Sequence, residues 1–259
     1  MVEADNIGFR AGHRDLLSGV TARFDPGRLH LIIGANGAGK STLVKVLSRL
    51  LRPATGRVLY DGREIGHATE RDLARRRAVL SQAIEVAFPL TVREVVMMGR
   101  YPHFGTRPAA HDEEIVDEVM DFFEVSDMAE RSYPTLSGGE KQRVNFARVL
   151  AQVWRPTAGH HRVLFLDEPL TFLDIRHQIE FMKKIRATTA GGDMIVIGVV
   201  HDLNLAARFA DRLLLLLDGR VVAEGSGADV LTPSNIRAAF GIEPVVTVAP
   251  GGGTHLIFD

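Results

Sequence analysis

A glycine-rich segment early in the chain combines the residue types and the spacing that bind phosphate. Gly34–Ser41, with the sequence GANGAGKS, follows the apolar run Arg28–Ile33 and opens the helix-like stretch Lys40–Leu51. Backbone amides in such a turn can curl around phosphate oxygens, and a helix N-terminus adds a partial positive charge. The fixed positions and the strand-and-helix context both match the P-loop pattern. We therefore expect Lys40 to reach the β- and γ-phosphates of a nucleotide and the Ser41 hydroxyl to ligate Mg²⁺.

Two adjacent carboxylates end an apolar run later in the chain. Val163–Leu166 is strand-like and is followed directly by Asp167 and Glu168. Such a strand would deliver the Asp167 carboxylate to the edge of a sheet, where it can hold the Mg²⁺ shell. The Glu168 side chain would point elsewhere and would be placed to polarise an attacking water. The pair could also be a simple strand-end cap, but a P-loop in the same chain favours the catalytic interpretation.

A second helix start has the character of an anion site. The segment Leu136–Arg143 reads LSGGEKQR, with Ser137, Gly138 and Gly139 opening a helix. A serine and two glycines at this position again leave backbone amides free for an anion. The chain therefore carries two phosphate-binding helix starts, whereas a simple P-loop kinase or small GTPase needs only one.

Apolar runs alternate with amphipathic stretches and predict the elements that position these groups. Three runs are strand-like and fully buried in character: Val163–Leu166, Met194–Val200 and Leu213–Leu217. Ile175–Thr188 and Leu203–Phe209, which lie between them, are helix-like. Continuous apolar strands that alternate with amphipathic helices indicate a parallel sheet covered on both faces.

Shorter patterns predict local features. Asp61-Gly62 and Asp218-Gly219 each lie between apolar runs and predict hairpin turns. The spacing of the apolar side chains predicts one helix over Lys40–Leu51, and these side chains are Leu43, Val46, Leu47 and Leu50.

The middle of the chain, Pro89–Val153, has no comparable strand-like run. Helical patterns cover Thr91–Gly99, Asp112–Glu124 and Gly139–Val153, which predicts a mostly helical subdomain inserted in the α/β core. The following stretch, Trp154–His161, contains proline and glycine and predicts a loop. Its two adjacent histidines could suggest a metal, but no carboxylate lies at a suitable spacing, so a solvated loop is favoured.

The composition excludes several classes of function. Among 259 residues, 46% are hydrophobic and 24% are charged, and the formal net charge is −1, which excludes affinity for DNA through global charge. The chain has no cysteine, so disulfides, thiolate metal sites and a cysteine nucleophile are excluded. No signal-peptide pattern opens the chain, and its apolar runs fall far below the roughly 20 residues of a membrane helix. We expect a soluble, cytosolic chain that reaches a membrane only through a partner.

The LSGGE run, together with the P-loop and the paired carboxylates, resembles the nucleotide-binding subunits of ATP-binding cassette (ABC) transporters. The resemblance spans nearly the whole chain, from Val2 to Phe240. It implies that two such subunits pack head to tail, so that each ATP lies between the P-loop of one and the LSGGE run of the other. Ser137 and Gly139 would then contact the γ-phosphate across the dimer.

The resemblance also implies roles for residues outside these motifs. Gln82 matches a glutamine that links Mg²⁺ and water to the membrane partner, although by itself it would be a surface glutamine. His201 follows the run Ile195–Val200 and matches a histidine that touches the γ-phosphate, although it could also cap a strand. Asp174 resembles the family's inter-subunit aspartate.

Three positions depart from the commonest family pattern. Phe9 best matches the adenine-stacking aromatic, where tyrosine is usual, and it could equally be a core strand residue. Ala35 replaces a frequent proline and Leu170 a usual threonine. Neither of these two changes touches a catalytic group.

The expected site residues form three groups. The catalytic group is Glu168, His201 and Gln82, and the metal ligands are Ser41, Gln82 and Asp167. The nucleotide contacts are Phe9, Gly34, Asn36, Gly37, Ala38, Gly39, Lys40, Ser41, Thr42, Ser137, Gly138, Gly139 and Asp174.

A narrower resemblance bears on the cargo. The importer branch that serves iron-siderophore, heme and cobalamin uptake in bacteria has segments similar to Phe88–Val95 and Met98–His103. The loop Val153–Arg162 resembles the corresponding loop of the heme-importer ATPases in particular. Heme is the first expectation and iron-siderophore the second. Related ATPases of chromosome maintenance and repair are the alternative class, but they carry long coiled coils, and no heptads are sustained here.

The expected architecture is a single ABC ATP-binding domain over residues 1–259. It is an α/β P-loop NTPase core with a mainly parallel sheet, a small antiparallel β portion and a helical subdomain inserted at about residues 89–153. With ATP and Mg²⁺, it would act as a homodimer on two copies of a transmembrane permease at the cytoplasmic face of the inner membrane. A periplasmic binding protein would deliver cargo, and no nucleic acid is expected as a partner.

Overall fold

A six-stranded sheet is the centre of the molecule in the computed structural model, which describes residues 1–80, 89–156, 159–170, 173–248 and 253–258. Its strands are β10 (Arg220–Gly225), β9 (Arg212–Leu217), β3 (Arg28–Ile33), β8 (Met194–Val199), β7 (Arg162–Asp167) and β6 (Arg77–Leu80), in that order across the sheet. All neighbours are parallel except β10, which is antiparallel to β9. This confirms the predicted mainly parallel sheet.

The two faces of this sheet are buried in two different cores because side chains alternate along each strand. In β7, Leu164 and Leu166 belong to a first core cluster, whereas Val163 and Phe165 belong to a second. Every residue of β8 is buried. A strand that is covered on both faces needs apolar residues at every position, which is why the sequence shows continuous runs rather than alternation.

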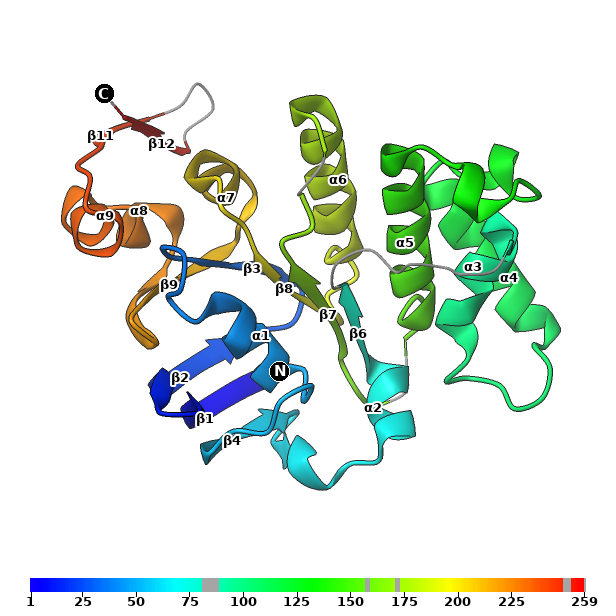
Figure 1. The fold of residues 1–259 in the computed structure, drawn as a ribbon, viewed down its shortest axis with the longest axis horizontal. Helices are drawn as coiled ribbons and strands as arrows, with labels where there is room; N and C mark the ends of the chain where they lie inside the picture. Colours follow the sequence, from blue (N-terminus) through cyan, green and yellow to red (C-terminus); the bar gives the residue numbers. More distant parts are fainter. Residues whose placement is uncertain (81–88, 157–158, 171–172, 249–252, 259) are drawn as a thin grey trace.

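Different layers cover the two faces (Figure 1). The second cluster is closed by α1 (Lys40–Leu47) and by a smaller antiparallel sheet. The strands of that sheet are β2 (Arg14–Phe24), β1 (Val2–Ala11), β4 (Thr55–Tyr60) and β5 (Arg63–Glu64), in that order. The first cluster is closed by α5 (Gly138–Gln152), α6 (Ile175–Thr188) and α7 (Leu203–Phe209). The predicted bounds of the helices at 175–188 and 203–209 are confirmed.

Both Asp-Gly pairs form the predicted hairpin turns. Asp61 and Gly62 have φ of 52° and 74° between β4 and β5, and Asp218 and Gly219 have φ of 47° and 74° between β9 and β10. Two successive positive φ values define the turn whose twist matches that of the flanking strands.

The helix after the P-loop is shorter than predicted. It ends at Leu47, Arg49 has φ 58°, and Leu50 is 53% exposed, so the prediction of one helix to Leu51 is wrong. The Arg49 guanidinium donates to the carbonyls of Ile65 and Ala68. Leu50 and Leu51 donate their N–H groups back to the Lys45 carbonyl, a local pattern that closes the helix after the left-handed residue.

Residues 89–153 are mostly helical, as predicted. They form α3 (Val92–Met97), α4 (Ala110–Phe122), α5 and short 3₁₀ turns at Met98–Arg100, Ser126–Met128 and Tyr133–Thr135, with one isolated bridge between Thr91 and Ser132. Their apolar side chains, including Val116 and Val144, belong to the same core cluster as Leu164 of β7.

The remaining elements are short. They are the 3₁₀ turn Ile65–His67, α2 (Glu70–Arg76), α8 (Gly227–Val230), α9 (Pro233–Phe240) and the hairpin of β11 (Val245–Val248) with β12 (Thr254–Ile257). Within the ranges that the structure covers, no helix is long and apolar enough to cross a membrane.

Candidate functional site

The P-loop leaves β3 through glycines that no other residue could replace without strain. Gly34, Gly37 and Gly39 have φ of 149°, 81° and 100°. A Cβ on Gly34 would lie 2.3 Å from the Leu216 carbonyl oxygen, and one on Gly39 would lie 2.6 Å from that of Leu16. Neighbouring backbone therefore leaves no room for a side chain at Gly34 or Gly39, and only glycine fits at these two positions.

Lys40 begins α1 and turns back over this loop. Its side chain is only 5% exposed, and Nζ donates to the carbonyls of Gly34 at 2.9 Å and Ala35 at 3.0 Å. Burial lowers the pKa of the ammonium, and the carboxylates of Glu168 and Asp167 oppose that shift. The ammonium is thus held at the phosphate-binding loop by carbonyl oxygens, which a phosphate oxygen could replace as a partner.

The predicted metal ligands Ser41 and Asp167 lie side by side. Ser41 Oγ donates to Asp167 Oδ1 at 2.8 Å, although the two residues are 126 positions apart in the sequence. Parallel pairing brings the carboxyl end of β7 next to the start of α1. A hydroxyl and a carboxylate oxygen together form a donor set that suits Mg²⁺.

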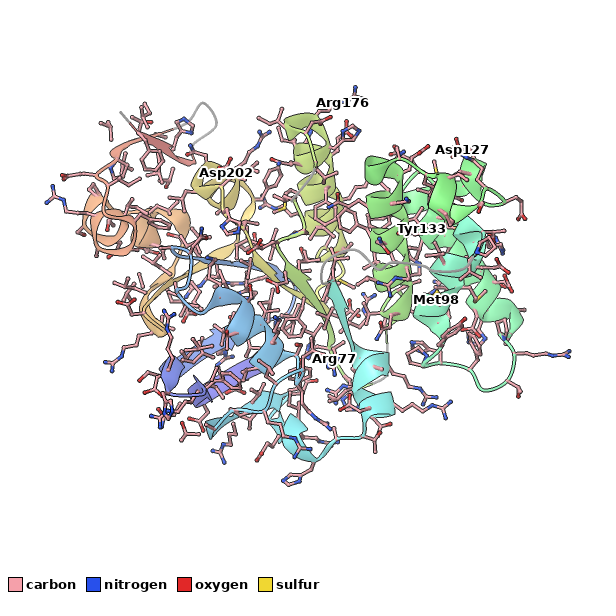
Figure 2. All side chains as sticks on the ribbon, in the orientation of Figure 1. Arg77, Met98, Asp127, Tyr133, Arg176 and Asp202 are labelled. Carbon is pink, nitrogen blue, oxygen red and sulfur yellow. The ribbon has the colours of Figure 1, made fainter. Side chains whose placement is uncertain are left out.

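Glu168 leaves the strand direction at once. It has φ 53°, a left-handed conformation that an L residue rarely adopts, and its Oε1 lies 2.9 Å from Nε2 of His201. Such residues are strained by about 1–3 kcal/mol and cluster at functional sites. Glu168 and His201 are 37% and 48% exposed, so both can meet a bound molecule. Asp202, which follows His201, caps α7 and so fixes the position where the segment after β8 enters this helix (Figure 2).

The LSGGE segment opens α5 as predicted. Ser137 is the N-cap: its Oγ accepts from the Glu140 N–H at 3.3 Å, and its own N–H donates to Glu140 Oε2 at 2.7 Å. Hydrogen bonds from Ser137 and Arg131 lower the pKa of Glu140 to about 2. Gly138 and Gly139 are exposed, and a Cβ on either would meet no atom within 4 Å. The start of this helix therefore presents backbone amides at an open surface.

The P-loop and the LSGGE segment, the two predicted anion sites, lie apart within a single chain. Helix α6 and strand β7 lie between α1 and α5 (Figure 1). The P-loop side is gathered with Asp167, Glu168 and His201, whereas Ser137 and its glycines belong to another part of the molecule.

The other residues predicted for the site lie in a helix cap, in a strand and in or beside the P-loop, and one lies outside the described residues. Asp174 caps α6 and accepts from the His177 N–H at 2.9 Å; hydrogen bonds from His177 hold the pKa of Asp174 below its usual range. The Phe9 ring is partly buried against the second core cluster. Thr42 lies in the first turn of α1, and Asn36 is exposed at the P-loop. Gln82 lies outside the residues that the structure describes.

Sequence reasoning missed the contact that Gln142 makes. Its Nε2 donates to the Pro169 carbonyl at 2.6 Å, so α5 contacts the chain immediately after Glu168. The only available signal was a glutamine in the second turn of the LSGGE helix.

The two histidines before β7 are not simply solvated. His161 Nδ1 lies 2.6 Å from Asp61 Oδ1, so the tertiary fold supplies a carboxylate that sequence spacing did not. Burial raises the pKa of Asp61, but hydrogen bonds from the amino terminus and from His161 outweigh it and lower this pKa to about 2. Among the described residues, no group of three or more histidines and carboxylates is placed to hold a metal ion.

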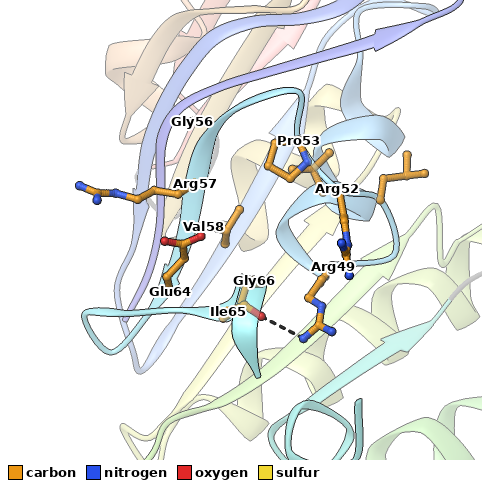
Figure 3. Close-up of a pocket in the computed structure, with 11 residues that line it drawn as sticks. Arg49, Arg52, Pro53, Gly56, Arg57, Val58, Glu64, Ile65 and Gly66 are labelled. Carbon is orange, nitrogen blue, oxygen red and sulfur yellow. Dashed lines mark hydrogen bonds between the residues drawn. The ribbon is translucent and has the colours of Figure 1, made fainter. Parts of the chain in front are cut away.

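A small pocket lies away from all of these groups (Figure 3). Its volume is about 50 Å³, and its walls include Arg49, Arg52, Pro53 and Glu64. Arg49 is already bonded to the Ile65 carbonyl, so this pocket does not compete with the P-loop as the candidate site.

Comparisons with known proteins show the family of this chain. The family model described as "ABC transporter" matches residues 17–171. A curated relative, "Hemin import ATP-binding protein HmuV" of Bradyrhizobium diazoefficiens, is 47% identical over 97% of this chain and 92% of its own length.

Solved structures give the same fold. An ABC transporter assigned to the metal-chelate type, solved in an inward-facing conformation, superposes with a TM-score of 0.83 at 24% identity, over 100% of this chain and 96% of that one. A dimeric ATP-binding cassette bound to ADP and Pi gives 0.73 at 26% identity, over 87% and 98%. The predicted α/β P-loop NTPase fold is confirmed. From its family model and its nearly full-length relative, this chain belongs to the ABC transporter family, as one of the family's ATP-hydrolysing subunits.

Proposed function

We propose that this chain is the ATPase of a bacterial hemin importer, which powers uptake through a membrane permease. The assignment of hemin as the cargo rests on the similarity to the hemin-import ATPase over nearly the full length of both chains. A soluble motor does not touch the cargo, so the site geometry supports the ATPase activity and the relative supports the substrate class.

In this proposal, the residues at the carboxyl end of the sheet divide the work of hydrolysis. The P-loop amides and Lys40 bind the phosphates. Ser41 and Asp167 would hold Mg²⁺, which suits their two oxygens 2.8 Å apart and which, when bound, neutralises phosphate charge. Glu168 accepts a proton from the attacking water, and His201, 2.9 Å from it, orients this carboxylate and the γ-phosphate.

The active unit that we propose is a head-to-tail homodimer. One chain keeps its P-loop and its LSGGE helix in different places, so a complete site requires the exposed Ser137–Gly139 amides of a second copy. The dimeric cassette bound to ADP and Pi is a precedent for dimerisation of such cassettes. Asp174 would lie near this interface while it caps α6.

We further propose that the dimer sits on two permease copies at the cytoplasmic face of the inner membrane, with a periplasmic binding protein that delivers hemin. Gln82 would link the site to the permease. Residues 89–153 would act as a helical subdomain within the single ATPase domain; their helices support this assignment.

Growth of a bacterium on defined iron sources tests the cargo. Deletion of the gene should abolish growth with hemin as the sole iron source while growth on a ferric siderophore continues. The wild-type gene should restore growth on hemin, and a Glu168→Gln allele should not. A deletion strain that still uses hemin but loses the siderophore or cobalamin would show that the cargo assignment is wrong.

A further inference from the structure

Three successive residues at the end of β7, Asp167, Glu168 and Pro169, each contact a different element. The first two contact α1 and the segment after β8, through the pairs described above. The third offers its carbonyl to Nε2 of Gln142 at 2.6 Å. Gln142 belongs to α5, the helix that opens with LSGGE and has no expected contact with the nucleotide of its own chain.

The turn that these contacts hold is strained. Glu168 has φ 53°, and a non-glycine residue stays in this region only where its surroundings hold it there. Pro169 adds a fixed φ of its own and restricts the residue before it. A hydrogen bond to the Pro169 carbonyl therefore restrains the chain one residue beyond the strained position, on the side away from the strand.

The Gln142 contact is well placed to transmit a shift of its helix. Gln142 is partly buried and lies in the second turn of α5, only five positions after the capping serine Ser137. A helix is stiff over this distance, so a displacement of the LSGGE end also displaces the Gln142 amide. The Pro169 carbonyl is bonded to that amide, and the turn at Glu168 must follow or lose the bond.

We infer that Gln142 is a positioning residue that couples the LSGGE helix to the catalytic carboxylate of the same chain. This inference rests on the proposed function, in which the LSGGE helix of one chain contacts the ATP held by the other. Occupation of one ATP site then sets the geometry of Glu168 at the second site. Gln142 itself touches no nucleotide and takes no proton.

Substitution of Gln142 should slow turnover without weakening nucleotide binding. Gln142→Ala removes the hydrogen bond to the Pro169 carbonyl, and the loss of one neutral hydrogen bond corresponds to a rate loss of about two- to tenfold. Gln142→Glu places a carboxylate against a carbonyl oxygen and should lose at least as much. Lys40 bonds to the Gly34 and Ala35 carbonyls, whereas the Gln142 amide bonds to the Pro169 carbonyl, so the Kd for ATP should stay within about twofold of the wild type.

The chain offers a matched control at the other end of the same helix. Gln152 Nε2 donates to the Ala74 carbonyl at 2.6 Å and to that of Arg77 at 2.9 Å. It therefore shares the residue type, the helix and the kind of hydrogen bond, but it bonds to α2 and to the first residue of β6. Gln152→Ala should lower the melting temperature as Gln142→Ala does and leave turnover unchanged.

The test compares five full-length proteins: wild type, Gln142→Ala, Gln142→Glu, Gln152→Ala and Glu168→Gln. Single-turnover hydrolysis, the Kd for ATP, the melting temperature and hydrogen–deuterium exchange of peptides containing Glu168 are measured for each. The inference predicts slower hydrolysis and faster exchange of the Glu168 peptides for both Gln142 variants. Gln152→Ala should match the wild type in both measurements. It is overturned if Gln142→Ala matches the wild type in both measurements, if Gln152→Ala loses as much rate, or if the Kd rises in parallel. Failure of the inference would leave Glu168→Gln inactive, whereas an active Glu168→Gln would overturn the proposed catalytic role as well.

Discussion

His201 Nε2 lies 2.9 Å from Glu168 Oε1, where the neighbouring parallel strands β8 and β7 have just ended. The register pairs Asp167 with Val199, so the residues that follow each strand emerge at the same edge of the sheet. The P-loop leaves β3, the other neighbour of β8, at that edge. The Glu168 carboxylate, the His201 imidazole and the P-loop therefore share one sheet edge.

Glu168→Gln should bind ATP but hydrolyse it very slowly. The substitution keeps the side-chain shape and removes the basic carboxylate, which should slow the chemical step by about 10²–10⁴-fold. Lys40, Ser41 and Asp167 still hold the nucleotide, so the dimer should close and stay closed. Single-turnover hydrolysis and gel filtration in ATP-Mg²⁺ measure both effects, and Glu180→Gln, a surface ion-pair change, is the control. A variant with ordinary turnover, or one that cannot bind ATP, would contradict the general-base role.

Lys40→Ala should abolish hydrolysis and weaken ATP binding. The buried ammonium, bonded to the Gly34 and Ala35 carbonyls, is the cation that we expect to meet the β- and γ-phosphates. Lys45→Ala, on the exposed side of the same helix, is the matched control and should behave as the wild type. Equilibrium binding of a fluorescent ATP analogue and steady-state turnover are the measurements. Near-normal turnover at saturating ATP would rule out the P-loop assignment.

Ser137→Arg should leave ATP binding by the monomer intact and prevent ATP-driven dimerisation. A bulky cation at the exposed start of α5 would block the second half of the composite site. The loss of the helix cap alone costs about 1 kcal/mol, and Ser226→Arg controls for this cost because Ser226 heads α8 with the same capping box. Gel filtration with ATP in the Glu168→Gln background is the assay. Dimerisation of the Ser137→Arg variant there would show that the composite-site model is wrong.

Asp61 should make the stability of the protein depend on pH in the acid range. Its folded-state pKa of about 2 lies below the ordinary value of 3.8, so the unfolded chain binds the proton more readily. The resulting stabilisation, about 2 kcal/mol, is fully present above pH 4 and is lost as the pH falls toward 2. Urea unfolding from pH 6 to pH 2 should show a shallower loss for Asp61→Asn than for the wild type. Identical slopes for Asp61→Asn and the wild type would contradict the assignment.

The sequence by itself predicted the features that depend on neighbours along the chain. The Asp-Gly turns were predictable because few residues adopt two successive positive φ values. The buried strands were predictable because coverage on both faces requires uninterrupted apolar runs, as in β8. The P-loop and the capping serine Ser137 depend on local backbone chemistry, and their residue types disclose it.

Only the tertiary structure decided the contacts between residues far apart in the chain. Ser41 meets Asp167, Asp61 meets His161, and Gln142 meets Pro169 because strand order and helix packing bring their elements together. Spacing along a sequence reports the period of one element, whereas the distance between two side chains depends on how whole elements pack.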